Sequence, residues 1–404
     1  MDVLFYRYGS ICEPDVLSVF EKMGLSVHEC NPEITNKNLT NEQRLNAVSE
    51  ILCAHPIQFI FSINFYPFLS EVCQKLGVLY VCWSVDCPVL ELFSASVRNS
   101  CNRIFLFDYN QYLTIHPQNP DCVFYLPLAT NVARWDEVLQ TISDEDIRKY
   151  SSDISFVGSL YHEKSPLSPL YRADHASLPK ASTLSDFWKG YADGLCESQL
   201  KIYGYNFLEE AVSEEFITEL KKNYRDFYKP ENTFTNTDAY VAANYYLGMH
   251  VSELERIRAL NLLAASHKVT LYTRSDTSLL QNVDCRGGVS THSEMPKIFH
   301  CSKINLNITI KSIQSGLSLR VWDVLGCGGF LLTNYQTELP EYLEIGKDLD
   351  CYESMADLKA KAAYYLKHED LRREIAENGY KKVKQFHTYE ARIASMLKII
   401  LHQA

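Results

Sequence analysis

Two apolar runs, IQFIFSINF (57–65) and GVLYVCWSVD (77–86), decide the fold class of this 404-residue chain. Runs this apolar are typical of strands buried on both faces, as in a parallel sheet that is covered by helices. The pattern begins at DVLFYRYG (2–9) and continues with NRIFLFD (102–108) and CVFYLPLA (122–129). Because helical stretches alternate with these runs, the first third of the chain predicts a doubly wound α/β domain.

Helix signals stand between the strands of this domain. In the segment after the first strand, Pro14 occupies the expected first turn of a helix and Gly24 its end. LSVHEC (25–30) follows as a second strand. In the next helical segment, Thr40 and Gln43 have the spacing of a capping box.

A second set of strands begins at DISFVGSLY (153–161) and resumes with KVTLYTRSD (268–276), INLNIT (304–309) and GFLLTN (329–334). GGVS (287–290) is a further short strand in this prediction. The alternation predicts a second domain of the same α/β class, followed by amphipathic helices. Because such sheets bind ligands at the carboxyl ends of their strands, we expect a ligand in the crevice between the two domains.

The predicted division follows from these patterns. It assigns 1–133 to a first Rossmann-like domain, 134–151 to a polar linker with a short helix, 152–385 to a second Rossmann-like domain and 386–404 to a C-terminal helix. Residues from about 161 to 255 are rich in charge and tyrosine, which predicts a helical insertion. Its tyrosines fit an acceptor platform, a docking surface or ordinary core packing, and they include Tyr203, Tyr205, Tyr245 and Tyr246.

The composition excludes several classes of function. Acidic residues outnumber basic ones by 50 to 39, a formal net charge of −11, so we expect no general affinity for nucleic acid. The 13 cysteines form no Cys-x-x-Cys pair and no zinc pattern, which indicates free thiols in a reducing compartment. The N-terminus lacks signal-peptide features and no apolar run reaches the roughly 18 residues of a membrane span, so the expected localisation is cytoplasmic.

The clearest candidate site lies in SGLSLRVWDVLGCGGFLLTN (315–334), an apolar stretch with one arginine and one aspartate. The period predicts a helix of about three turns over 317–327, in which Arg320 and Asp323 share a face. The free N–H groups of the helix N-terminus and Arg320 suit an anion, and Asp323 can accept two adjacent hydroxyls. A nucleoside diphosphate presents its diphosphate and sugar in that order. The alternative is an ordinary Arg–Asp pair on a solvent-exposed face.

Residues 304–354, followed by 368–392, resemble the C-terminal half of the CgeB-like (spore maturation protein B-like) glycosyltransferases, which have the GT-B fold. The N-terminal third looks like the uncharacterised domain that often precedes this half, on the motifs FSINFYP, WSVDCP, IFLFD and YLPLATN. The resemblance implies two Rossmann-like domains facing across a cleft. It also implies a nucleotide-sugar site in the second domain, an acceptor site in the first, and C-terminal helices that cross back to the first domain.

The resemblance also assigns roles within the candidate stretch. In broader retaining GT-B families, two acidic residues lie eight positions apart, the first at the donor sugar and the second at the nucleotide ribose. Asp323 takes the second position, but the first falls on Ser315, so the donor-sugar contact is altered here. Gly316 and Leu317 complete the predicted nucleotide-sugar stretch. Glu338 is another acid near this site, with a helix N-terminal acid as the alternative.

Other strand ends supply further nucleotide-sugar candidates. The resemblance implies that backbone at Gly158 and Ser159 approaches the diphosphate, whereas an ordinary strand-to-loop glycine is the alternative. Arg274 ends another strand and is a candidate for phosphate or base contact, or else a solvated arginine. His292 could contact the edge of the base, although helix capping by a neighbouring hydroxyl is the simpler interpretation.

In the first domain, Asp86 follows a buried strand and precedes a proline turn, so its carboxylate is expected to point into the crevice. It could act as a general base on an acceptor hydroxyl, or simply cap its turn. Gly9, Ser10 and Asn64 end neighbouring strands and are expected to line the acceptor side. Because no Asp-x-Asp motif follows a strand, we expect a metal-independent reaction in which Arg320 and the helix terminus neutralise the leaving diphosphate.

The sequence, with this resemblance, therefore predicts a glycosyltransferase without a cofactor. Its expected co-substrate is a nucleotide-diphosphate sugar, with a UDP-sugar favoured. Its expected acceptor is a protein or a cell-surface glycan. Two other classes remain open. One is a non-catalytic nucleotide-sugar-binding or interaction protein on the same scaffold, which the missing acid at Ser315 favours. The other is a sugar-nucleotide epimerase or hydrolase, which would use water or no acceptor.

Overall fold

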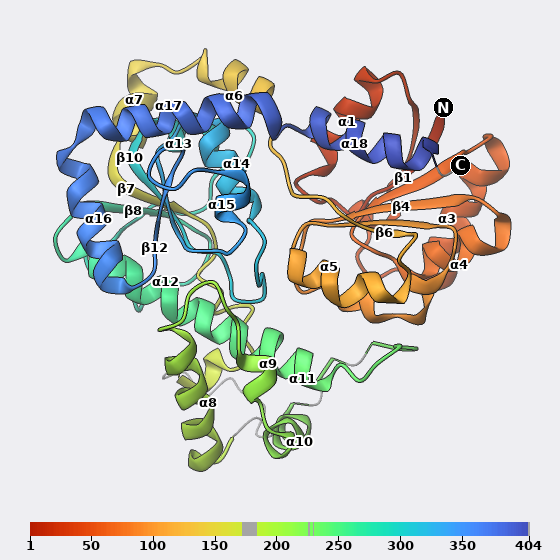
Figure 1. The fold of residues 1–404 in the computed structure, drawn as a ribbon, viewed down its shortest axis with the longest axis horizontal. Helices are drawn as coiled ribbons and strands as arrows, with labels where there is room; N and C mark the ends of the chain where they lie inside the picture. The colour runs from red at the N-terminus through yellow and green to blue at the C-terminus, as the bar shows by residue number, and fades with distance from the viewer. Residues whose placement is uncertain (172–183, 225–226, 229, 403–404) are drawn as a thin grey trace. The chain divides into compact units, whose positions relative to one another are not determined.

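The computed structural model describes residues 1–171, 184–224, 227–228 and 230–402, which fold into two compact units (Figure 1). The first unit comprises Met1–Asn131, Pro230–Thr235 and His387–Ala404, and the second comprises Val132–Lys229 and Asn236–Phe386. Each unit is built around a parallel six-stranded sheet, so the predicted α/β class with two sheets is confirmed.

The sheet of the first unit has the order β2-β1-β3-β4-β5-β6. Its strands are β1 (Asp2–Tyr6), β2 (Ser26–Cys30), β3 (Phe59–Ile63), β4 (Leu79–Ser84), β5 (Asn102–Leu106) and β6 (Val123–Tyr125). β3 and β5 are buried at every position, which explains why most of their residues are apolar. The order of the strands reverses between β1 and β3, so their carboxyl ends mark the switch point of this sheet.

The helix signals of the first unit are confirmed. Its helices include α1 (Glu13–Lys22), α2 (Pro32–Thr35), α3 (Asn41–Ala54), α4 (Pro67–Leu76), α5 (Tyr109–Ile115) and α18 (Tyr389–His402). Pro14 lies in the first turn of α1, and the predicted capping box between Thr40 and Gln43 begins α3. α18 packs beside α1 (Figure 1), so the C-terminal helix returns to the first unit as the resemblance implies.

A short segment from later in the chain, Pro230–Thr235, also belongs to the first unit. The backbone N–H of Ala95 donates to the carbonyl of Asn232 at 2.7 Å, and that of Phe234 donates to Phe93 at 3.0 Å. The rings of Phe93 and Phe234 lie 5.8 Å apart. The region predicted as an insertion into the second domain therefore gives one short segment of turns and bends to the first unit.

The sheet of the second unit has the order β12-β11-β10-β7-β8-β9. Its strands are β7 (Ser152–Val157), β8 (Val269–Tyr272), β9 (Asp284–Cys285), β10 (Ser302–Asn307), β11 (Leu331–Asn334) and β12 (Asp350–Tyr352). The prediction of a strand at 287–290 is wrong, because the edge strand is β9 and the two glycines that follow it form a loop. β12 was not predicted, since three residues are too few to show an alternating pattern.

Helices of the second unit cover its sheet. They include α6 (Val132–Leu139), α7 (Asp144–Tyr150), α12 (Gly248–Ala264), α13 (Met295–Cys301), α14 (Leu319–Gly326), α15 (Leu339–Tyr342), α16 (Met355–Lys367) and α17 (Glu369–Phe386). The insertion contains α8 (Asp186–Gln199), α9 (Leu208–Ala211), α10 (Glu214–Asn223) and α11 (Asp238–Val241). It ends earlier than the predicted 255, because α12 packs on the sheet through Ala259, Leu260 and Leu263.

The polar stretch 134–151, interpreted as a linker with one short helix, instead forms most of α6 and all of α7. Trp135 and Tyr150 are both 3% exposed, and both helices pack against α13 of the second unit. Ser143 and Asp146 form a capping box that begins α7. The exposed faces of the two helices are polar, which is why the stretch resembles a linker in sequence. The buried aromatic residues pack both helices onto the second unit.

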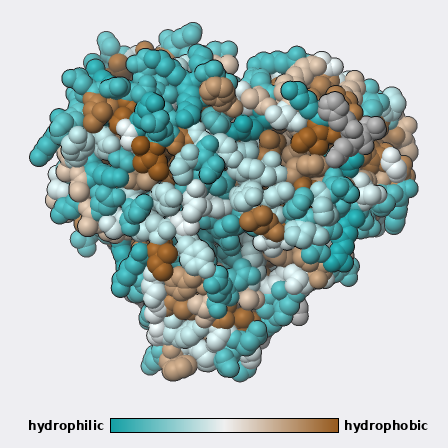
Figure 2. All heavy atoms as spheres, viewed as in Figure 1, coloured by the Kyte–Doolittle hydropathy of each residue, from teal (hydrophilic) through white to brown (hydrophobic). Residues whose placement is uncertain are grey.

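No helix in the described part of the chain is long and apolar enough to cross a membrane. The face drawn in Figure 2 is mostly hydrophilic, with apolar side chains in separate groups. All 13 cysteines are free, as predicted, although Cys53 and Cys285 are exposed. Among the described residues, no cluster of three or more His, Cys, Asp or Glu side chains is arranged to hold a metal ion.

Candidate functional site

The switch point of the second sheet lies between β7 and β10, because β7 pairs with β8 on one side and with β10 on the other. Doubly wound sheets bind their ligands at this point, beside the carboxyl ends of the strands. The loop after β7 begins at Gly158, and the loop after β10 runs over 308–318. These loops hold five of the predicted nucleotide-sugar residues, namely Gly158, Ser159, Ser315, Gly316 and Leu317.

Arg256 of α12 joins the two loops. Its Nη1 donates to the carbonyl of Ser159 and its Nη2 to the carbonyl of Ile308, both at 2.6 Å. The guanidinium lies over the ring of Tyr161, 4.4 Å from the ring centroid. Arg256 is 8% exposed, and this burial lowers its pKa, but an arginine remains charged in a protein. A buried positive charge therefore stands at the switch point.

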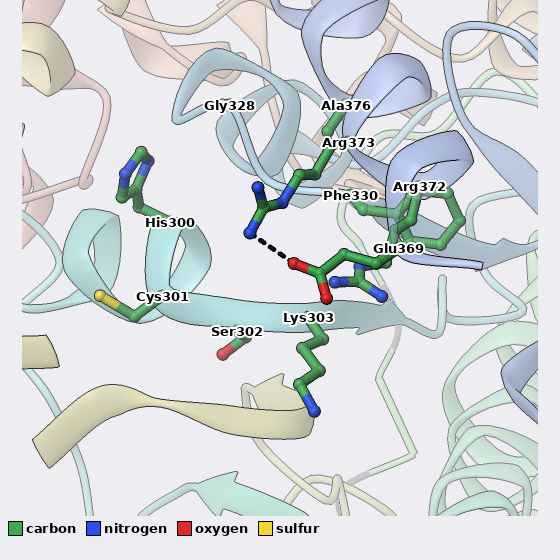
Figure 3. A pocket seen from close by; sticks show the side chains of 10 residues that line it. All are labelled: His300, Cys301, Ser302, Lys303, Gly328, Phe330, Glu369, Arg372, Arg373 and Ala376. Carbon is green, nitrogen blue, oxygen red and sulfur yellow. Dashed lines mark ion pairs between the residues drawn. The ribbon is translucent and has the colours of Figure 1, made fainter. Parts of the chain in front are cut away.

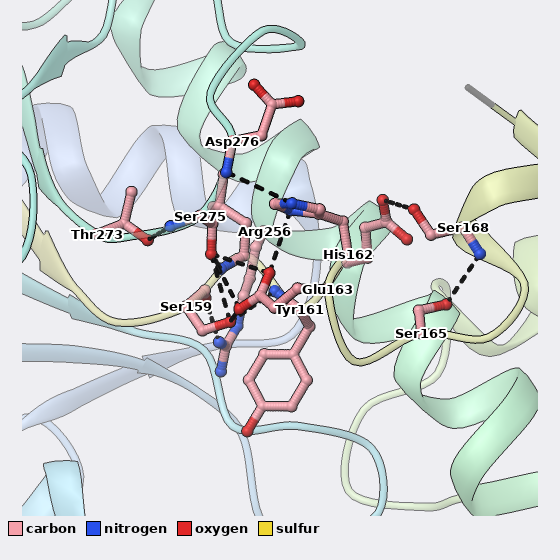
Figure 4. A network of polar contacts seen from close by, with 12 residues as sticks. Ser159, Tyr161, His162, Glu163, Ser165, Ser168, Arg256, Thr273, Ser275 and Asp276 are labelled. Atoms are coloured by element: carbon pink, nitrogen blue, oxygen red, sulfur yellow. Dashed lines mark hydrogen bonds and ion pairs between the residues drawn. The ribbon is translucent and has the colours of Figure 1, made fainter. Parts of the chain in front are cut away.

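A polar network holds the loop after β7 against the loop after β8 (Figure 4). Ser159 Oγ donates to the carboxylate of Glu163, and Ser275 Oγ lies 3.1 Å from the same carboxylate. The backbone N–H of Leu160 donates to Ser275 Oγ at 2.8 Å. The Ser159 hydroxyl is engaged inside this network, the Ser159 carbonyl accepts from Arg256, and the Gly158 N–H donates to the Tyr272 carbonyl at 3.0 Å.

A second buried cation lies in the loop after β10. Lys311 Nζ is 3.0 Å from Oε2 of Glu255 in α12, and the two side chains are 9% and 0% exposed. The backbone N–H of Lys311 donates to Ser252 Oγ at 3.0 Å. Asn206, from the insertion, donates to the Lys311 carbonyl at 2.8 Å. The loop is thus fastened both to α12 and to the insertion.

Glu338 brings a carboxylate to the position where the sequence has serine. Ser315 Oγ donates to Glu338 Oε1 at 2.7 Å, and the Glu338 N–H donates to the Ser315 carbonyl at 3.3 Å. Gln336 Nε2 donates to the carbonyls of Ile313 and Gly316, both at 3.2 Å. Glu338 precedes α15, but its side chain does not cap that helix. These contacts clamp the loop after β10 to the loop after β11.

Arg320 and Asp323 form the expected pair, but its surroundings differ from both interpretations of the sequence. Helix α14 begins at Leu319, so it is shorter than the predicted three turns. Arg320 Nη1 lies 3.5 Å from Asp323 Oδ2, contacts the sulfur of Met295, and its guanidinium lies 5.2 Å from the ring centroid of Phe299. Arg320 thus leans onto α13, because the aromatic face, the sulfur and the carboxylate favour it there. Asp323 is 4% exposed, so this is no solvent-exposed pair.

Arg274 and His292 also have contacts within the protein. Arg274 is exposed and lies over Gly288, where an added Cβ would come within 2.6 Å of its side chain. His292 Nδ1 is 3.1 Å from Nη1 of Arg134 in α6. No side chain caps α13, so the capping interpretation of the residues around His292 is wrong. The contact with Arg134 orients the imidazole instead.

In the first unit, Asn64 ties together the carboxyl ends of β1, β3 and β4. Its Nδ2 donates to Asp86 Oδ2 at 2.7 Å and to the Tyr8 hydroxyl at 3.0 Å, while its Oδ1 accepts from the Val85 N–H at 3.0 Å. Asn64 has a left-handed backbone, with φ of +61°. Asp86 is exposed. The switch point of the first sheet therefore presents an accessible carboxylate whose position is set by an amide.

The turn after β1 is closed by a buried glutamate. Glu13 is fully buried and accepts from the backbone N–H groups of Tyr8 and Gly9, at 2.9 and 3.1 Å, and from Arg7 Nε at 3.0 Å. Gly9 has a φ of +94°, which favours glycine. The Ser10 carbonyl accepts from the Glu13 N–H. Gly9 and Ser10 thus belong to a structural turn, and their place on an acceptor site stays a prediction.

Two tyrosines of the insertion serve packing. Tyr246 is 4% exposed, and its ring lies 5.0 Å from that of Tyr224. The ring of Tyr203 packs 5.7 Å from that of Tyr352, beside the second sheet. Tyr205 is exposed and donates to Glu210. The core-packing interpretation therefore holds for Tyr203 and Tyr246.

Sequence reasoning missed Arg256, Glu255 and Lys311. The first two had a signal, because ELERIRALNLLAA places adjacent charged residues in a helix that is buried on most sides. Charges in such a helix need partners or a ligand. Lys311 had no local signal, since its partner comes from another element of the fold.

Residues 251–398 match a protein family described as glycosyl transferase-like. No curated protein sequence matches the chain significantly.

Solved structures match along nearly the whole chain. Sucrose-phosphate synthase from Thermosynechococcus elongatus has a TM-score of 0.55 at 9% identity, covering 100% of this chain and 99% of that one. A glycosyltransferase from Rickettsia africae has a TM-score of 0.53 at 12% identity, covering 98% and 97%. HepE from Anabaena, solved in complex with UDP-glucose, has a TM-score of 0.51 at 9% identity, covering 100% of both chains. The predicted GT-B fold is thereby confirmed.

Proposed function

We propose that this chain is a glycosyltransferase that transfers a sugar from a nucleotide-diphosphate sugar to a protein or glycan acceptor. A UDP-sugar is the favoured donor. The observation that carries the proposal is the contact between Ser315 and Glu338. It supplies a carboxylate beside the position where the resemblance to GT-B enzymes expects an acid and the sequence has none. The similarity to glycosyltransferases of the same fold supports the reaction class, and the UDP-glucose in HepE supports the donor.

On the donor side, the second unit provides groups for each part of a nucleotide sugar. Arg256 places a buried positive charge at the switch point, the sign that a diphosphate requires, and Lys311, whose charge is paired with Glu255, lies in the loop after β10. Asp323 takes the position that contacts the ribose in the family that the sequence resembles. Glu338 is the proposed contact of the donor sugar, where a carboxylate accepts hydrogen bonds from hydroxyls and stabilises positive charge at the anomeric carbon.

On the acceptor side, Asp86 is the proposed general base. Its carboxylate is exposed, and Asn64 Nδ2 and the Tyr8 hydroxyl contact one of its oxygens at 2.7 and 3.3 Å. A carboxylate held through one oxygen keeps the other for the proton of an attacking hydroxyl. The proposed reaction needs no metal, because cationic side chains and backbone N–H groups can neutralise the leaving diphosphate.

The first test is the thermal stability of the full-length protein against a panel of nucleotides and nucleotide sugars, with EDTA and then with added Mg²⁺. A ligand at a hundred times its Kd adds about 2.7 kcal/mol of stability. We expect one nucleoside diphosphate and its sugar to raise the Tm in EDTA, and Asp323→Ala to abolish the shift. A shift that appears only with Mg²⁺ would contradict the metal-independent mechanism.

Turnover then separates the function classes. Release of the nucleoside diphosphate that depends on an added acceptor supports a transferase, and Glu338→Gln should abolish it while the Tm shift remains. Release of the nucleoside diphosphate without any added acceptor, with water taking the sugar, would indicate a hydrolase. Binding without release, across a panel of protein and glycan acceptors, would favour the non-catalytic alternative.

A further inference from the structure

We propose that the second unit carries a separate binding site for a small oxyanion of the phosphate type, at the amino ends of its strands (Figure 3). The site is a pocket of about 260 Å³. It lies between the start of β10 at Ser302 and Lys303, the turn that leads into β11 at Phe330, and the first turns of α17. This inference does not depend on the proposed transferase activity.

The pocket is remote from the candidate nucleotide-sugar site. It lies where β10 begins, whereas that site lies where β10 ends. A strand of six residues spans on the order of 20 Å at about 3.3 Å per residue. An anion in the pocket therefore lies at the amino ends of the strands. It cannot be the diphosphate of a donor that is bound at their carboxyl ends.

Arg372 is the residue whose side chain would bind the anion. It is 6% exposed and lines the pocket, and Figure 3 shows its guanidinium beside Glu369 and above Lys303. Its Nη1 donates to the Tyr365 carbonyl at 2.9 Å. No other side-chain hydrogen bond and no ion pair of Arg372 is found within the described residues. Of its five N–H donors, four are thus left for a ligand or water.

The other charges around the pocket are already matched. Glu369 forms an ion pair with Arg373 on the same helix. Lys303 Nζ lies 2.7 Å from Asp153 Oδ1. Glu369 and Asp153 also act electrostatically on Arg372, but the three cations Lys303, Arg372 and Arg373 outnumber these two carboxylates. One positive charge is therefore only partly compensated. Such a charge is costly when it is buried, and binding an anion removes that cost.

The size and shape of the site favour a phosphate group. Its volume is below the range of about 300 to 1,000 Å³ that is usual for drug-sized ligands. The planar guanidinium fork binds a phosphate through two parallel hydrogen bonds. A purely structural role for Arg372, as a cap on the Tyr365 carbonyl at the end of α16, would use only one of its donors.

The test uses the full-length protein and inorganic phosphate as the probe. Phosphate replaces chloride at constant ionic strength, the Tm is followed to saturation, and the Kd is measured by calorimetry. Arg372→Met should abolish the saturable response. Lys381→Met removes a cation from the same helix outside the pocket and should leave the response unchanged.

Two further variants keep the proposal falsifiable if Arg372→Met does not fold. Glu369→Gln removes the carboxylate from the pocket and should tighten phosphate binding several-fold. Lys303→Met should weaken binding by a similar factor. No saturable response in the natural protein would overturn the proposal, and so would an affinity that none of the pocket variants changes. A response to citrate but not to phosphate would overturn the phosphate class.

Discussion

Ser315 and Glu338 share a 2.7 Å hydrogen bond although they stand 23 positions apart in the chain. The bond closes the loop after β10 onto the loop after β11 and buries both residues, which are 3% and 6% exposed. In the proposed function, Glu338 supplies the carboxylate that position 315 lacks. The consequences of this pairing can be tested.

Glu338→Gln should lower kcat by about a hundredfold or more, because removing one group that stabilises the transition state has this size of effect. The amide can still accept a hydrogen bond from Ser315, so the fold should be retained. Ser315→Ala is the matched control, and it should cost only about 1 kcal/mol of stability. Steady-state kinetics and urea unfolding of both variants give the answer. Equal loss of activity in the two variants would show that the pairing is only structural.

Substitutions of Asn64 should change the free energy of unfolding in two ways, through the loss of its amide contacts and through its left-handed backbone. Asn64→Ala and Asn64→Gly each remove the contacts with Asp86 and Tyr8. At a φ of +61°, however, alanine is strained by about 1 kcal/mol more than glycine. Urea unfolding should therefore find the alanine variant less stable than the glycine variant by about that amount. Equal stabilities would contradict the left-handed conformation.

The buried pair of Lys311 and Glu255 should behave as a unit. Lys311→Met leaves the glutamate without its cation, and breaking a buried pair in this way costs about 3 to 5 kcal/mol. The double variant Lys311→Met with Glu255→Gln should recover part of that loss, because no uncompensated charge remains. A double-mutant cycle of unfolding free energies measures the coupling. Additive effects would mean that the two side chains do not interact.

Asp146 should make the protein sensitive to acid. Hydrogen bonds from the Ser143 backbone N–H and from Lys297 lower its pKa from 3.8 to about 2. Because the folded-state pKa is the lower one, this contribution to stability is complete above about pH 4 and is lost as the pH falls toward 2. Asp146→Asn should flatten the dependence of Tm on pH in that window. An unchanged profile would exclude Asp146 as a source of acid sensitivity.

Two helical glycines should respond in opposite directions to alanine. A Cβ at Gly379 in α17 would stand 2.3 Å from the Asp348 carbonyl oxygen, so Gly379→Ala should cost at least about 2 kcal/mol. A Cβ at Gly194 in α8 would meet no atom within 4 Å, so Gly194→Ala should gain about 0.5 to 1 kcal/mol from helix propensity. Chemical unfolding distinguishes them. Destabilisation of both would argue against this packing.

Local signals in the sequence predicted those parts of the fold that depend on short-range physics. Apolar runs marked strands such as β3 and β5, and the pair of Thr40 and Gln43 marked the start of α3. The same signals failed where they were weak. β12 is too short to show a pattern, and the exposed faces of α6 and α7 disguised two packed helices as a linker.

The candidate site divides in the same way. Asp86 and Asn64 were identified because each follows a buried strand, and strand ends in parallel sheets gather at one edge. Their mutual hydrogen bond was not predictable, because it depends on the register of β3 with β4 and on the left-handed turn at Asn64. Arg320 was expected at an anion and lies instead on α13, because the choice among its neighbours is made by packing.

By itself, the sequence determined the α/β class, the two sheets, the first turn of α1 and the start of α3, and the strand ends that carry polar side chains. These follow from hydrophobic period, capping and turn chemistry, all of which act over a few residues. Only the tertiary structure decided that Glu338 stands beside Ser315, that Lys311 pairs with Glu255, and that Arg372 is buried in a pocket with more cations than carboxylates. Such pairs join elements distant in sequence, and their geometry is set by how the helices pack on the sheet.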